Sequence, residues 1–190
     1  MKLSVYIAAS LDGFIARENG DVDWLECVGS DGDAEDYGFQ DFFSSVSCLV
    51  MGRNTFEKVL TFGRWPYEGK RVVVMTRSLK TLPVAMKGKV ELFSTSPEAL
   101  VDKLNVENET HLYIDGGRLI QSFLRSSLVD EINISYIPIL LGRGIPLFGS
   151  LDTEIRLKHA NTKAYPTGLV QSKYLVPSGD NQPSVNTLSN

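Results

Sequence analysis

Four short segments of the chain carry residue types that bind phosphate groups. Each follows an apolar run and combines small, hydroxyl-bearing or basic residues; the four are Ala8-Ala9-Ser10, Gly52-Arg53-Asn54-Thr55, Thr76-Arg77-Ser78 and Asp115-Gly116-Gly117-Arg118. Glycine lets a ligand approach the backbone closely, and the arginine guanidinium pairs with phosphate oxygens. The unpaired N–H groups and the positive dipole end at a helix start favour the same ligand. Together the segments indicate a binding site for a phosphate-rich cofactor.

Each segment also has a purely structural interpretation. Gly116-Gly117 fits a tight turn between a strand and a helix, Arg53 and Arg77 fit solvated surface charges, and Asn54 fits a helix N-cap. The cofactor site therefore depends on the coincidence of four segments and not on any one of them. The G-x-G-x-x-G motif of the common dinucleotide-binding fold does not follow the first apolar run, and the chain has no P-loop.

The elements that must position these segments alternate between strands and helices. Apolar or alternating runs predict strands at residues 3–9, 47–52, 71–76, 90–93, 111–115, 131–141, 154–160 and 169–176. The spacing of apolar residues and the capping signals predict helices over 35–46, from Asn54 with a capping box, from Ser96, and over 119–124. This order predicts one α/β domain whose sheet is parallel at first and ends in an antiparallel hairpin. Ligands of open α/β sheets lie beyond the carboxyl ends of the strands, which is where all four segments fall.

Composition and charge exclude several classes of protein. The chain has 190 residues, of which 43% are hydrophobic and 22% are charged, as is typical of one globular domain. Its apolar runs are too short to span a bilayer, and its formal net charge of -4 gives no overall attraction to nucleic acid. The first residues lead directly into an apolar run without the pattern of a signal peptide. Cys27 and Cys48 form no C-x-x-C motif, so we expect a reduced, cytoplasmic setting.

Two further expectations concern metal ions and the end of the chain. The 2 histidines, His111 and His159, are far apart in the sequence, so we expect no histidine-rich metal site. From Pro177 onward the residues are mainly Ser, Asn, Pro, Gly and Asp, with little to bury. We therefore expect one domain over residues 1–176, followed by a disordered polar tail over residues 177–190.

Four longer motifs resemble those of the dihydrofolate reductase-like superfamily. They are Ser10-Leu11-Asp12-Gly13-Phe14-Ile15-Ala16, Val50-Met51-Gly52-Arg53-Asn54-Thr55-Phe56-Glu57, Tyr113-Ile114-Asp115-Gly116-Gly117, and the P-x-L-x-G-x-G-x-x-L-F pattern over residues 138–148. Their order is most similar to that of the reductase domain of riboflavin biosynthesis, the RibD C-terminal domain, and its stand-alone relatives. The resemblance implies a dihydrofolate reductase-like three-layer sandwich, with a mixed, mostly parallel central sheet and a C-terminal antiparallel hairpin. It also implies a homodimer.

The resemblance implies NADPH as the hydride donor. The residues that it assigns to the cofactor are Gly52, Arg53, Asn54 and Thr55 for the phosphates, Thr76, Arg77 and Ser78 for the adenosine 2′-phosphate, Gly116, Gly117, Arg118, Leu119 and Ile120 for the pyrophosphate and the approach to the nicotinamide, and Ala8 and Ala9 for the nicotinamide amide. The loop from Ser10 to Trp24 would act as the active-site lid.

The chain departs from the riboflavin enzymes in two ways. The zinc deaminase half of the bifunctional enzymes is missing, since the chain has neither H-x-E nor P-C-x-x-C. The aromatic-faced helix over 35–46 is also closer to that of dihydrofolate reductases, in which an acidic residue near the helix start holds the pterin. Asp36 falls at the matching distance before Met51-Gly52-Arg53. The pattern over 138–148 points instead to the riboflavin-type reductase, so both substrate classes stay open.

Asp36 is the candidate catalytic and substrate-binding carboxylate. A carboxylate in an aromatic-lined pocket pairs with the amidine-like edge of a pterin or an aminopyrimidine. Partial burial would raise its pKa and let it relay a proton, and Phe39, one helical turn later, would contact the ring. The alternative is structural, with Asp33 as the helix N-cap and Asp36 as its capping partner.

Trp24, Asp12 and Arg143 are further candidates for substrate binding, and each has an alternative role. Trp24 lines the pocket or anchors its loop in the core. Asp12 contacts the substrate or only shapes the turn before Gly13. The riboflavin-type resemblance suggests that Arg143 binds a substrate phosphate, whereas the alternative leaves it in solvent.

We therefore expect an NADPH-dependent reductase that acts on a small pteridine or ribosylaminopyrimidine. The activity that it resembles most is that of 5-amino-6-(5-phosphoribosylamino)uracil reductase. The alternatives are a dihydrofolate reductase proper and a non-catalytic NADP(H)-binding protein. Neither nucleic acid nor a membrane is an expected partner.

Overall fold

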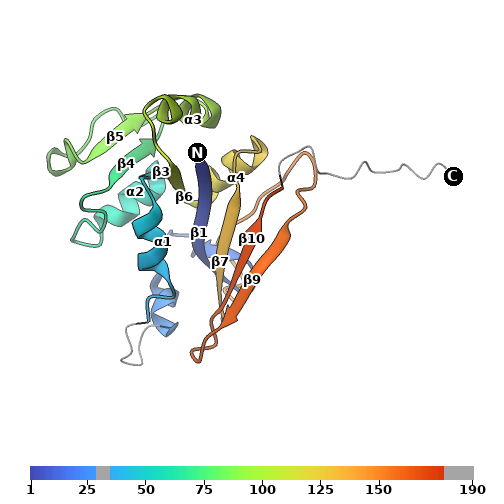
Figure 1. Cartoon of the computed structure of the whole chain (residues 1–190). Coiled ribbons are helices and arrows are strands. Elements are labelled where there is room, and N and C mark those ends of the chain that lie inside the picture. Colours follow the sequence, from blue (N-terminus) through green and yellow to red (C-terminus); the bar gives the residue numbers. More distant parts are fainter. Residues whose placement is uncertain (29–34, 178–190) are drawn as a thin grey trace, which may run out of the picture.

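The central feature of the fold is an eight-stranded mixed sheet (Figure 1). The structure, a computed structural model, describes residues 1–28 and 35–177. The strand order across the sheet is β5-β4-β3-β6-β1-β7-β10-β9. The strands are β1 (Lys2–Ser10), β3 (Cys48–Gly52), β4 (Arg71–Met75), β5 (Val90–Phe93), β6 (His111–Asp115), β7 (Glu131–Ile137), β9 (Lys158–Ala164) and β10 (Val170–Leu175). Neighbours from β5 to β7 are parallel, and β10 and β9 continue the sheet in antiparallel pairs, as predicted.

Four helices and a two-stranded sheet complete the described part of the chain. The helices are α1 (Phe39–Ser45), α2 (Arg53–Leu60), α3 (Pro97–Val106) and α4 (Gly117–Arg125). The small sheet pairs β2 (Phe14–Ala16) with β8 (Ile145–Pro146) in antiparallel orientation. Short 3-10 turns cover Asp23–Val28 and Val84–Met86. None of the helices in this part of the chain is long and apolar enough to cross a bilayer.

An apolar core on each face of the sheet holds the helices in place. On one face, Val5 of β1 packs with side chains of α3 and α4, among them Leu100 and Phe123. On the other face, aromatic side chains of α1 and Phe56 of α2 pack against Tyr113 of β6. Alternate residues of a strand point to opposite faces, so strands buried on both faces, such as β3, are apolar nearly throughout. The three-layer α/β sandwich is confirmed.

The structure differs from the sequence-based boundaries at three places. The helix expected from residue 35 begins at Phe39, because Tyr37 and Gly38 have φ angles of 56° and 82°, which a right-handed helix does not accept. The strand expected to reach residue 141 ends at Ile137, directly before a proline that has no N–H for the ladder. The strand expected at 154–160 lies at Lys158–Ala164, where every residue is exposed and leaves no apolar pattern to detect. The tail predicted over 177–190 lies, beyond residue 177, outside the described residues.

Candidate active site

The carboxyl ends of β4, β3, β6 and β1 lie next to one another along one edge of the sheet (Figure 1). The strand register places Gly52 beside Met75 and Met51 beside Asp115. The four segments singled out in the sequence begin at these strand ends, so the fold brings them together. This edge is therefore the candidate site, as the position of ligands in other α/β sheets predicts.

The turn between β6 and α4 packs tightly against the start of α2. Gly116 has a φ angle of 98°, and a Cβ atom on it would collide with Thr55 Oγ1. A Cβ atom on Gly117 would lie 2.8 Å from Ile15 Cδ1 and 3.1 Å from the carbonyl oxygen of Pro146. Gly116 therefore admits no side chain, and a Cβ atom at Gly117 would force Ile15 and the Pro146 backbone to shift. The starts of α2 and α4 therefore lie together, without a side chain of this turn between them.

Both of these helices begin without a side-chain cap. Their N-cap residues are Gly52 and Gly116, and neither makes a side-chain capping hydrogen bond. In α3, which follows β5, Ser96 Oγ accepts a hydrogen bond from the N–H of Ala99 at 3.3 Å, as predicted. The capping box predicted from Asn54 is wrong, because the helix begins one residue earlier with glycine at its N-cap. The first-turn N–H groups of α2 and α4 are thereby available to phosphate oxygens.

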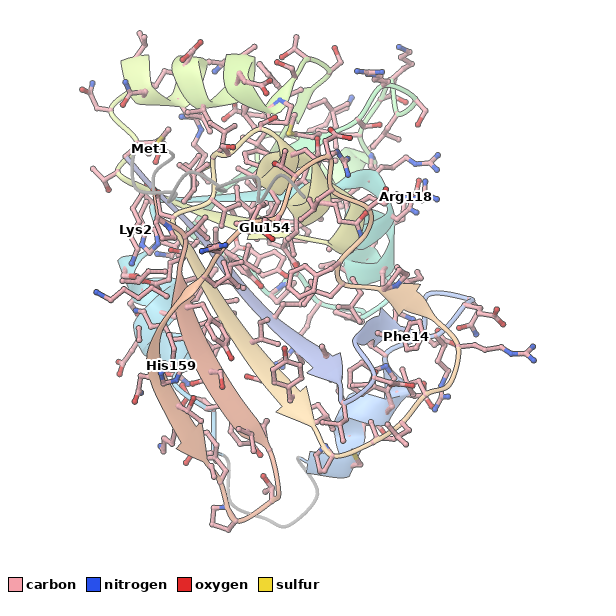
Figure 2. The ribbon with its side chains drawn as sticks, turned by 90° about the vertical axis from the view of Figure 1, so that its right-hand side faces the viewer. Met1, Lys2, Phe14, Arg118, Glu154 and His159 are labelled. Atoms are coloured by element: carbon pink, nitrogen blue, oxygen red, sulfur yellow. The ribbon has the colours of Figure 1, made fainter. Side chains whose placement is uncertain are left out.

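Exposed arginines flank the two helix starts. Arg53 extends from the first turn of α2, where its guanidinium contacts Asn54 Oδ1 at 3.4 Å and Glu57 Oε1 at 3.8 Å. Arg118 is exposed in the first turn of α4. Figure 2 shows Arg118 at the surface, on the side of the molecule away from Met1. Loose surface pairs of this kind contribute little to stability, so both guanidinium groups can turn toward a ligand.

The turn after β4 holds another arginine toward solvent. Thr76 Oγ1 accepts hydrogen bonds from the N–H groups of Ser78 at 3.2 Å and Leu79 at 3.0 Å. The Thr76 hydroxyl therefore shapes the turn, which leaves Arg77 and Ser78 exposed next to the end of β3. This arrangement suits Arg77 and Ser78 to a phosphate more than it suits Thr76.

Ile120 does not have the position that a cofactor contact requires. Its side chain is fully buried in the core, and its N–H donates to the carbonyl of Gly116 at 2.9 Å. It has no free polar group, so it holds α4 on the sheet instead. Leu119, one residue earlier, is half-buried, and its Cβ lies 4.0 Å from the point where a Cβ of Gly52 would be.

The backbone of Ala8 is open toward the same edge. β1 pairs with β6 only from Lys2 to Val5, whereas it pairs with β7 as far as Ser10. The N–H and C=O of Leu3 bond toward β7, through Asp130. These directions alternate along a strand, so the N–H and C=O of Ala8 face the side from which β6 has turned away. Ala9 bonds toward β7, and its side chain is fully buried in the opposite core.

Asp115 ends β6 as a half-buried carboxylate on the face covered by α1. Burial raises the pKa of Asp115 to about 6, and a backbone contact with Gly116 opposes this only in part. No lysine or arginine of the described residues contributes to the pKa of this group. In the sequence, Asp115 was singled out only as part of a cofactor-binding segment, and the raised pKa of its carboxyl group was not foreseen. The signal that could have found it is an acidic residue at the ligand-facing end of an apolar strand.

Trp24 contributes a buried donor beside Ala8. Its side chain is 3% exposed and packs in a small cluster with Ile137 and Leu169, against which Ala8 also packs. The Nε1–H of Trp24 has no hydrogen-bond partner among residues 1–28 and 35–177. An unpaired buried N–H group is costly, so this donor is suited to a ligand acceptor. Trp24 thus anchors its loop in the core and also borders the candidate site.

The model of the RibD C-terminal domain family matches residues 1–171. The chain belongs to this family. Two uncharacterized proteins of Bacillus subtilis (strain 168) are similar to it along most of their length. YwjB is 37% identical over 168 residues, which are 86% of this chain and 92% of YwjB. YyaP is 30% identical over 177 residues, which are 88% of this chain and 91% of YyaP.

Solved structures give the same placement. A Shewanella sp. PV-4 protein provisionally assigned to riboflavin biosynthesis has a TM-score of 0.89 and 39% identity, over 93% of this chain and 99% of that one. A deaminase and 5-amino-6-(5-phosphoribosylamino)uracil reductase of Thermotoga maritima has a TM-score of 0.71 at 16% identity, over 93% of this chain and 56% of that one. The second likeness shows the fold alone. The RibD-like, dihydrofolate reductase-like architecture expected from the sequence is confirmed.

Within this RibD C-terminal domain, Asp36 does not have the environment predicted for a proton relay. Its Oδ1 accepts from the N–H of Gly38 at 3.0 Å and its Oδ2 from the N–H of Gln40 at 2.9 Å. These backbone hydrogen bonds, that from Gln40 first, hold the pKa of Asp36 below its usual value, whereas the prediction required a raised pKa. Asp36 therefore accepts hydrogen bonds at the start of α1 in a structural role, but the N-cap of α1 is Gly38 and not Asp33, as the alternative had it. Its suggested partner, Asp33, lies outside the described residues.

The Asp12 carboxylate joins two loops through hydrogen bonds. Its Oδ1 accepts from Ser10 Oγ at 2.6 Å and from the N–H of Leu141 at 3.1 Å, and its Oδ2 accepts from the N–H of Gly142 at 2.7 Å. These bonds, that from Ser10 first, lower the pKa of Asp12. These contacts support the turn interpretation and extend it to the neighbouring loop, whereas contact of Asp12 with a substrate stays a prediction. Arg143 follows Gly142 and is exposed, without an ion pair among the described residues.

The segment predicted to be the active-site lid is fixed on one side. β2 pairs with β8, and the N–H of Leu147 donates to the carbonyl of Gly13 at 2.9 Å. Gly144 lies so close to the carbonyl of Ala16 that a Cβ atom would not fit. Together with the bonds of Asp12, these contacts fasten residues 10–16 to residues 141–147. If residues 10–16 move as a lid, residues 141–147 must move with them.

Phe39 belongs to a continuous aromatic wall on the same face as Asp115. Its ring lies 5.6 Å from that of Tyr6 and 5.4 Å from that of Phe43, centroid to centroid. Phe43 continues the wall to Tyr67 at 5.9 Å. The wall therefore borders the sheet on the face of Asp115. The contact of Phe39 with a substrate ring, which was predicted for a pocket around Asp36, stays a prediction.

Proposed function

We propose that the chain is an NADPH-dependent reductase of a small nitrogen heterocycle, of the pteridine or ribosylaminopyrimidine type. The observation that carries the proposal is the backbone of Ala8, whose N–H and C=O face a side of β1 that β6 no longer covers. The uncapped starts of α2 and α4 lie on one side of this position, and the aromatic wall lies on the other. A carboxamide has one donor and one acceptor side by side, which matches the N–H and C=O of a single strand residue. Membership of the RibD C-terminal domain family supports the same reaction class.

The residues present fit NADPH at two further points. The glycines at 116 and 117 let the starts of α2 and α4 lie close together, so a pyrophosphate can approach the backbone of both helix starts. Arg77 and Ser78 are exposed near these helix starts and would hold the 2′-phosphate, and Arg53 and Arg118 would hold the pyrophosphate. When bound, NADPH supplies the hydride.

The chain's own part in the reaction would be to orient the ring and supply a proton. Reduction of a C=N bond adds a hydride to carbon and a proton to nitrogen. The Asp115 carboxyl, with a pKa of about 6, is partly protonated near neutral pH and is accessible at the candidate site. It would therefore protonate the ring nitrogen, while the Nε1–H of Trp24 would donate to an acceptor on another edge of the ring.

Cofactor titration and a substrate panel test the proposal. NADPH and NADH are titrated by fluorescence, and NADPH should bind on the order of 10- to 100-fold more tightly, since one charge-assisted contact contributes roughly 1.5–3 kcal/mol. Arg77→Ala should weaken NADPH binding and leave NADH binding unchanged. NADPH absorbance is then followed with dihydropterins, folates and ribosylaminopyrimidines. Equal affinities for both cofactors would refute the cofactor assignment, and NADPH binding without turnover of any of these compounds would favour a non-catalytic NADP(H)-binding protein.

A further inference from the structure

A cavity of about 270 Å³ lies between α1 and the hairpin of β9 and β10. β1 and β7 form its floor, and in Figure 1 α1 stands on one side of these strands and the hairpin on the other. Figure 2 shows Lys2, which lines the cavity, and Arg118, which flanks the cofactor edge, on opposite sides of the molecule. The cavity is therefore a separate place on the protein from the cofactor edge.

The side chain of Tyr6 stands between the lysine end of this cavity and Ala8. Along β1, Tyr6 lies between Lys2 and Ala8, and the three side chains share one face of the sheet. Tyr6 Oη donates to the carbonyl of Tyr37 at 2.6 Å and accepts from Gln171 Nε2 at 2.8 Å. These bonds fix the Tyr6 hydroxyl between the segment before α1 and β10. A ligand at the lysine end would therefore be separated from the position proposed for the nicotinamide.

Two lysines of the cavity share one carboxylate oxygen. Lys2 Nζ lies 3.0 Å and Lys173 Nζ lies 2.8 Å from Glu131 Oε2, so the two ammonium nitrogens are no further apart than the sum of these distances. The Glu131 side chain is only 6% exposed. Burial acts to raise the pKa of Glu131, but the hydrogen bonds from Lys173 and Lys2 outweigh it and hold that pKa below its usual value. The carboxylate is therefore ionised at neutral pH, and the three groups together carry one positive charge.

The charge of Lys2 also reaches the buried ring of His111, which lines the same cavity. Burial lowers the pKa of His111 and the charge of Lys2 lowers it further, whereas a backbone contact with Ser45 and two nearby carboxylates oppose both. The two ring nitrogens are occupied, since Nε2 lies 2.8 Å from Ser4 Oγ and Nδ1 lies 3.2 Å from the carbonyl oxygen of Ser45. His111 is therefore a neutral part of the wall, and the lysines supply the positive charge.

The other carboxylates around the cavity are bonded to the backbone. Asp130, Glu35 and Asp36 each accept backbone N–H groups at 2.7–3.0 Å, and the charge of Lys163 also acts on Asp36. None of these three residues lines the cavity. Within the part of the chain that the structure describes, Glu131 is thus the one carboxylate in the wall of the cavity, and it balances one of the two ammonium groups.

Further hydrogen-bonding groups lie in a row beside Lys173. Lys173 is paired in the sheet with Asn133 of β7 and with Asn161 of β9, so the three side chains share one face. Both asparagines line the cavity, and their side-chain amides make no hydrogen bond to another described residue. Phe42 lines the cavity from α1, with its ring stacked on that of Tyr6 at 4.6 Å. The cavity therefore joins a cluster of free N–H donors to an apolar side.

We propose that this cavity is a second ligand site, which binds a small organic monocarboxylate between the ammonium groups of Lys2 and Lys173. Each ammonium group has three N–H donors and gives one to Glu131, so donors remain for a ligand carboxylate, and the asparagine amides add to them. The apolar part of the ligand lies against Phe42. One net positive charge matches a monoanion, whereas a phosphate dianion would be repelled more strongly by Glu131. The proposal is independent of the reductase function, because the cavity lies apart from the cofactor edge.

Benzoate, benzamide and inorganic phosphate test the site by calorimetry on the full chain, with and without saturating NADPH. Benzoate should bind with a Kd on the order of 1 mM, as a good ligand of its size does, and at least about 10-fold more tightly than the uncharged benzamide. Phosphate should bind more weakly than benzoate, and NADPH should leave the benzoate affinity unchanged. No binding of benzoate at about 20 mM, or equal affinity for benzamide or phosphate, would overturn the proposal. Displacement of benzoate by NADPH would place it at the cofactor edge and overturn the proposal as well.

Variants separate a ligand site from a purely structural ion pair. Lys173→Gln should weaken benzoate binding at least about fivefold, and Lys173→Arg, which keeps the charge, should retain it. Lys158→Gln is the matched control, because Lys158 is an exposed lysine of β9 that does not line the cavity, and its benzoate affinity should stay unchanged. Glu131→Gln removes the competing carboxylate, so benzoate should bind more tightly. Unchanged benzoate binding in Lys173→Gln, or no gain in Glu131→Gln, in proteins with the wild-type melting temperature, would show that the lysines serve only to hold Glu131.

Discussion

Asp115 and Asp36 show that the environment of a carboxylate, and not its presence in a motif, decides its chemistry. Both are acidic residues near the candidate site, but Asp36 accepts two backbone hydrogen bonds and Asp115 is buried without a basic partner. Their pKa values are shifted in opposite directions. The sequence could place both residues near strand or helix ends, but it could not show which carboxylate would be buried away from water. A catalytic carboxylate is therefore better sought at Asp115.

Burial of Asp115 should make the fold less stable as the pH rises. Its pKa of about 6 in the folded chain lies above the ordinary value of 3.8, so between these values the folded state binds more protons than the unfolded state. The free energy of unfolding should then fall as the pH rises from about 4 to about 6, with the full cost present above that range. Asp115→Asn removes this cost and should stabilise the chain at neutral pH by about 1–3 kcal/mol, while turnover falls. Denaturant unfolding at several pH values measures it, and an unchanged stability of the variant near neutral pH would contradict it.

Removal of the Asp36 carboxylate should affect stability and leave the chemistry intact. Asp36→Ala leaves the N–H groups of Gly38 and Gln40 without their acceptor and should lower the free energy of unfolding by about 0.5–2 kcal/mol, as lost caps do. Turnover per folded molecule and NADPH affinity should stay close to wild type. Chemical denaturation and steady-state kinetics measure the two effects separately. A large fall in turnover without a loss of stability would restore Asp36 as a catalytic residue.

At the scale of the elements, apolar runs and turn residues sufficed to predict most of the sheet. The strands at residues 47–52 and 71–76 were predictable because burial on both faces makes them almost continuously apolar, and the strand at 111–115 because its middle residues are apolar. The strand at 90–93 lies at the edge of the sheet and was predictable only as a short, mainly apolar run. The start of α1 and the position of β9, two of the three places where the prediction was wrong, depend on other forces. The start of α1 is set by the left-handed turn at Tyr37 and Gly38, and β9 is held by pairing with β10 and not by an apolar face of its own.

The contact between the starts of α2 and α4 should tolerate no side chain at Gly116. Gly116→Ala combines a φ angle of 98° with a collision against Thr55, so it should lower stability and NADPH affinity together. Gly88→Ala is the matched control, because Gly88 also has a positive φ angle, 79°, but open space around it. The control should lose about 1–2 kcal/mol of stability from backbone strain alone and keep its NADPH affinity. Melting curves and cofactor titration of both variants test this prediction. Equal losses of stability and of NADPH affinity in the two variants would argue against a steric role of the contact between Gly116 and Thr55.

At the scale of the whole molecule, the fold divides charge between two sides of one strand edge. The arginines at 53 and 118 lie in the helix starts that follow β3 and β6, and Arg77 lies in the turn after β4, whereas the carboxylates of Asp115 and Asp36 lie toward the face that α1 covers. This division follows from the strand order, in which β6 lies between β3 and β1. The end of β6 leads into α4 on the arginine side, and its last residue, Asp115, lies on the face that α1 covers. It could not be read from the net charge of the chain, which sums over both sides.

The divided charge should give the two ligands opposite responses to salt. NADPH affinity depends on exposed arginines that solvent ions screen, so raising the ionic strength from about 50 to about 500 mM should weaken NADPH binding by roughly 10-fold. An unphosphorylated ring bound beside the half-buried Asp115 carries no phosphate to be screened, and its affinity should change by less than about twofold. Titration of both ligands across a salt series measures the contrast. A ring affinity that falls as steeply as that of NADPH would mean that cations hold the substrate as well, and it would move the substrate site from Asp115 toward the arginine edge.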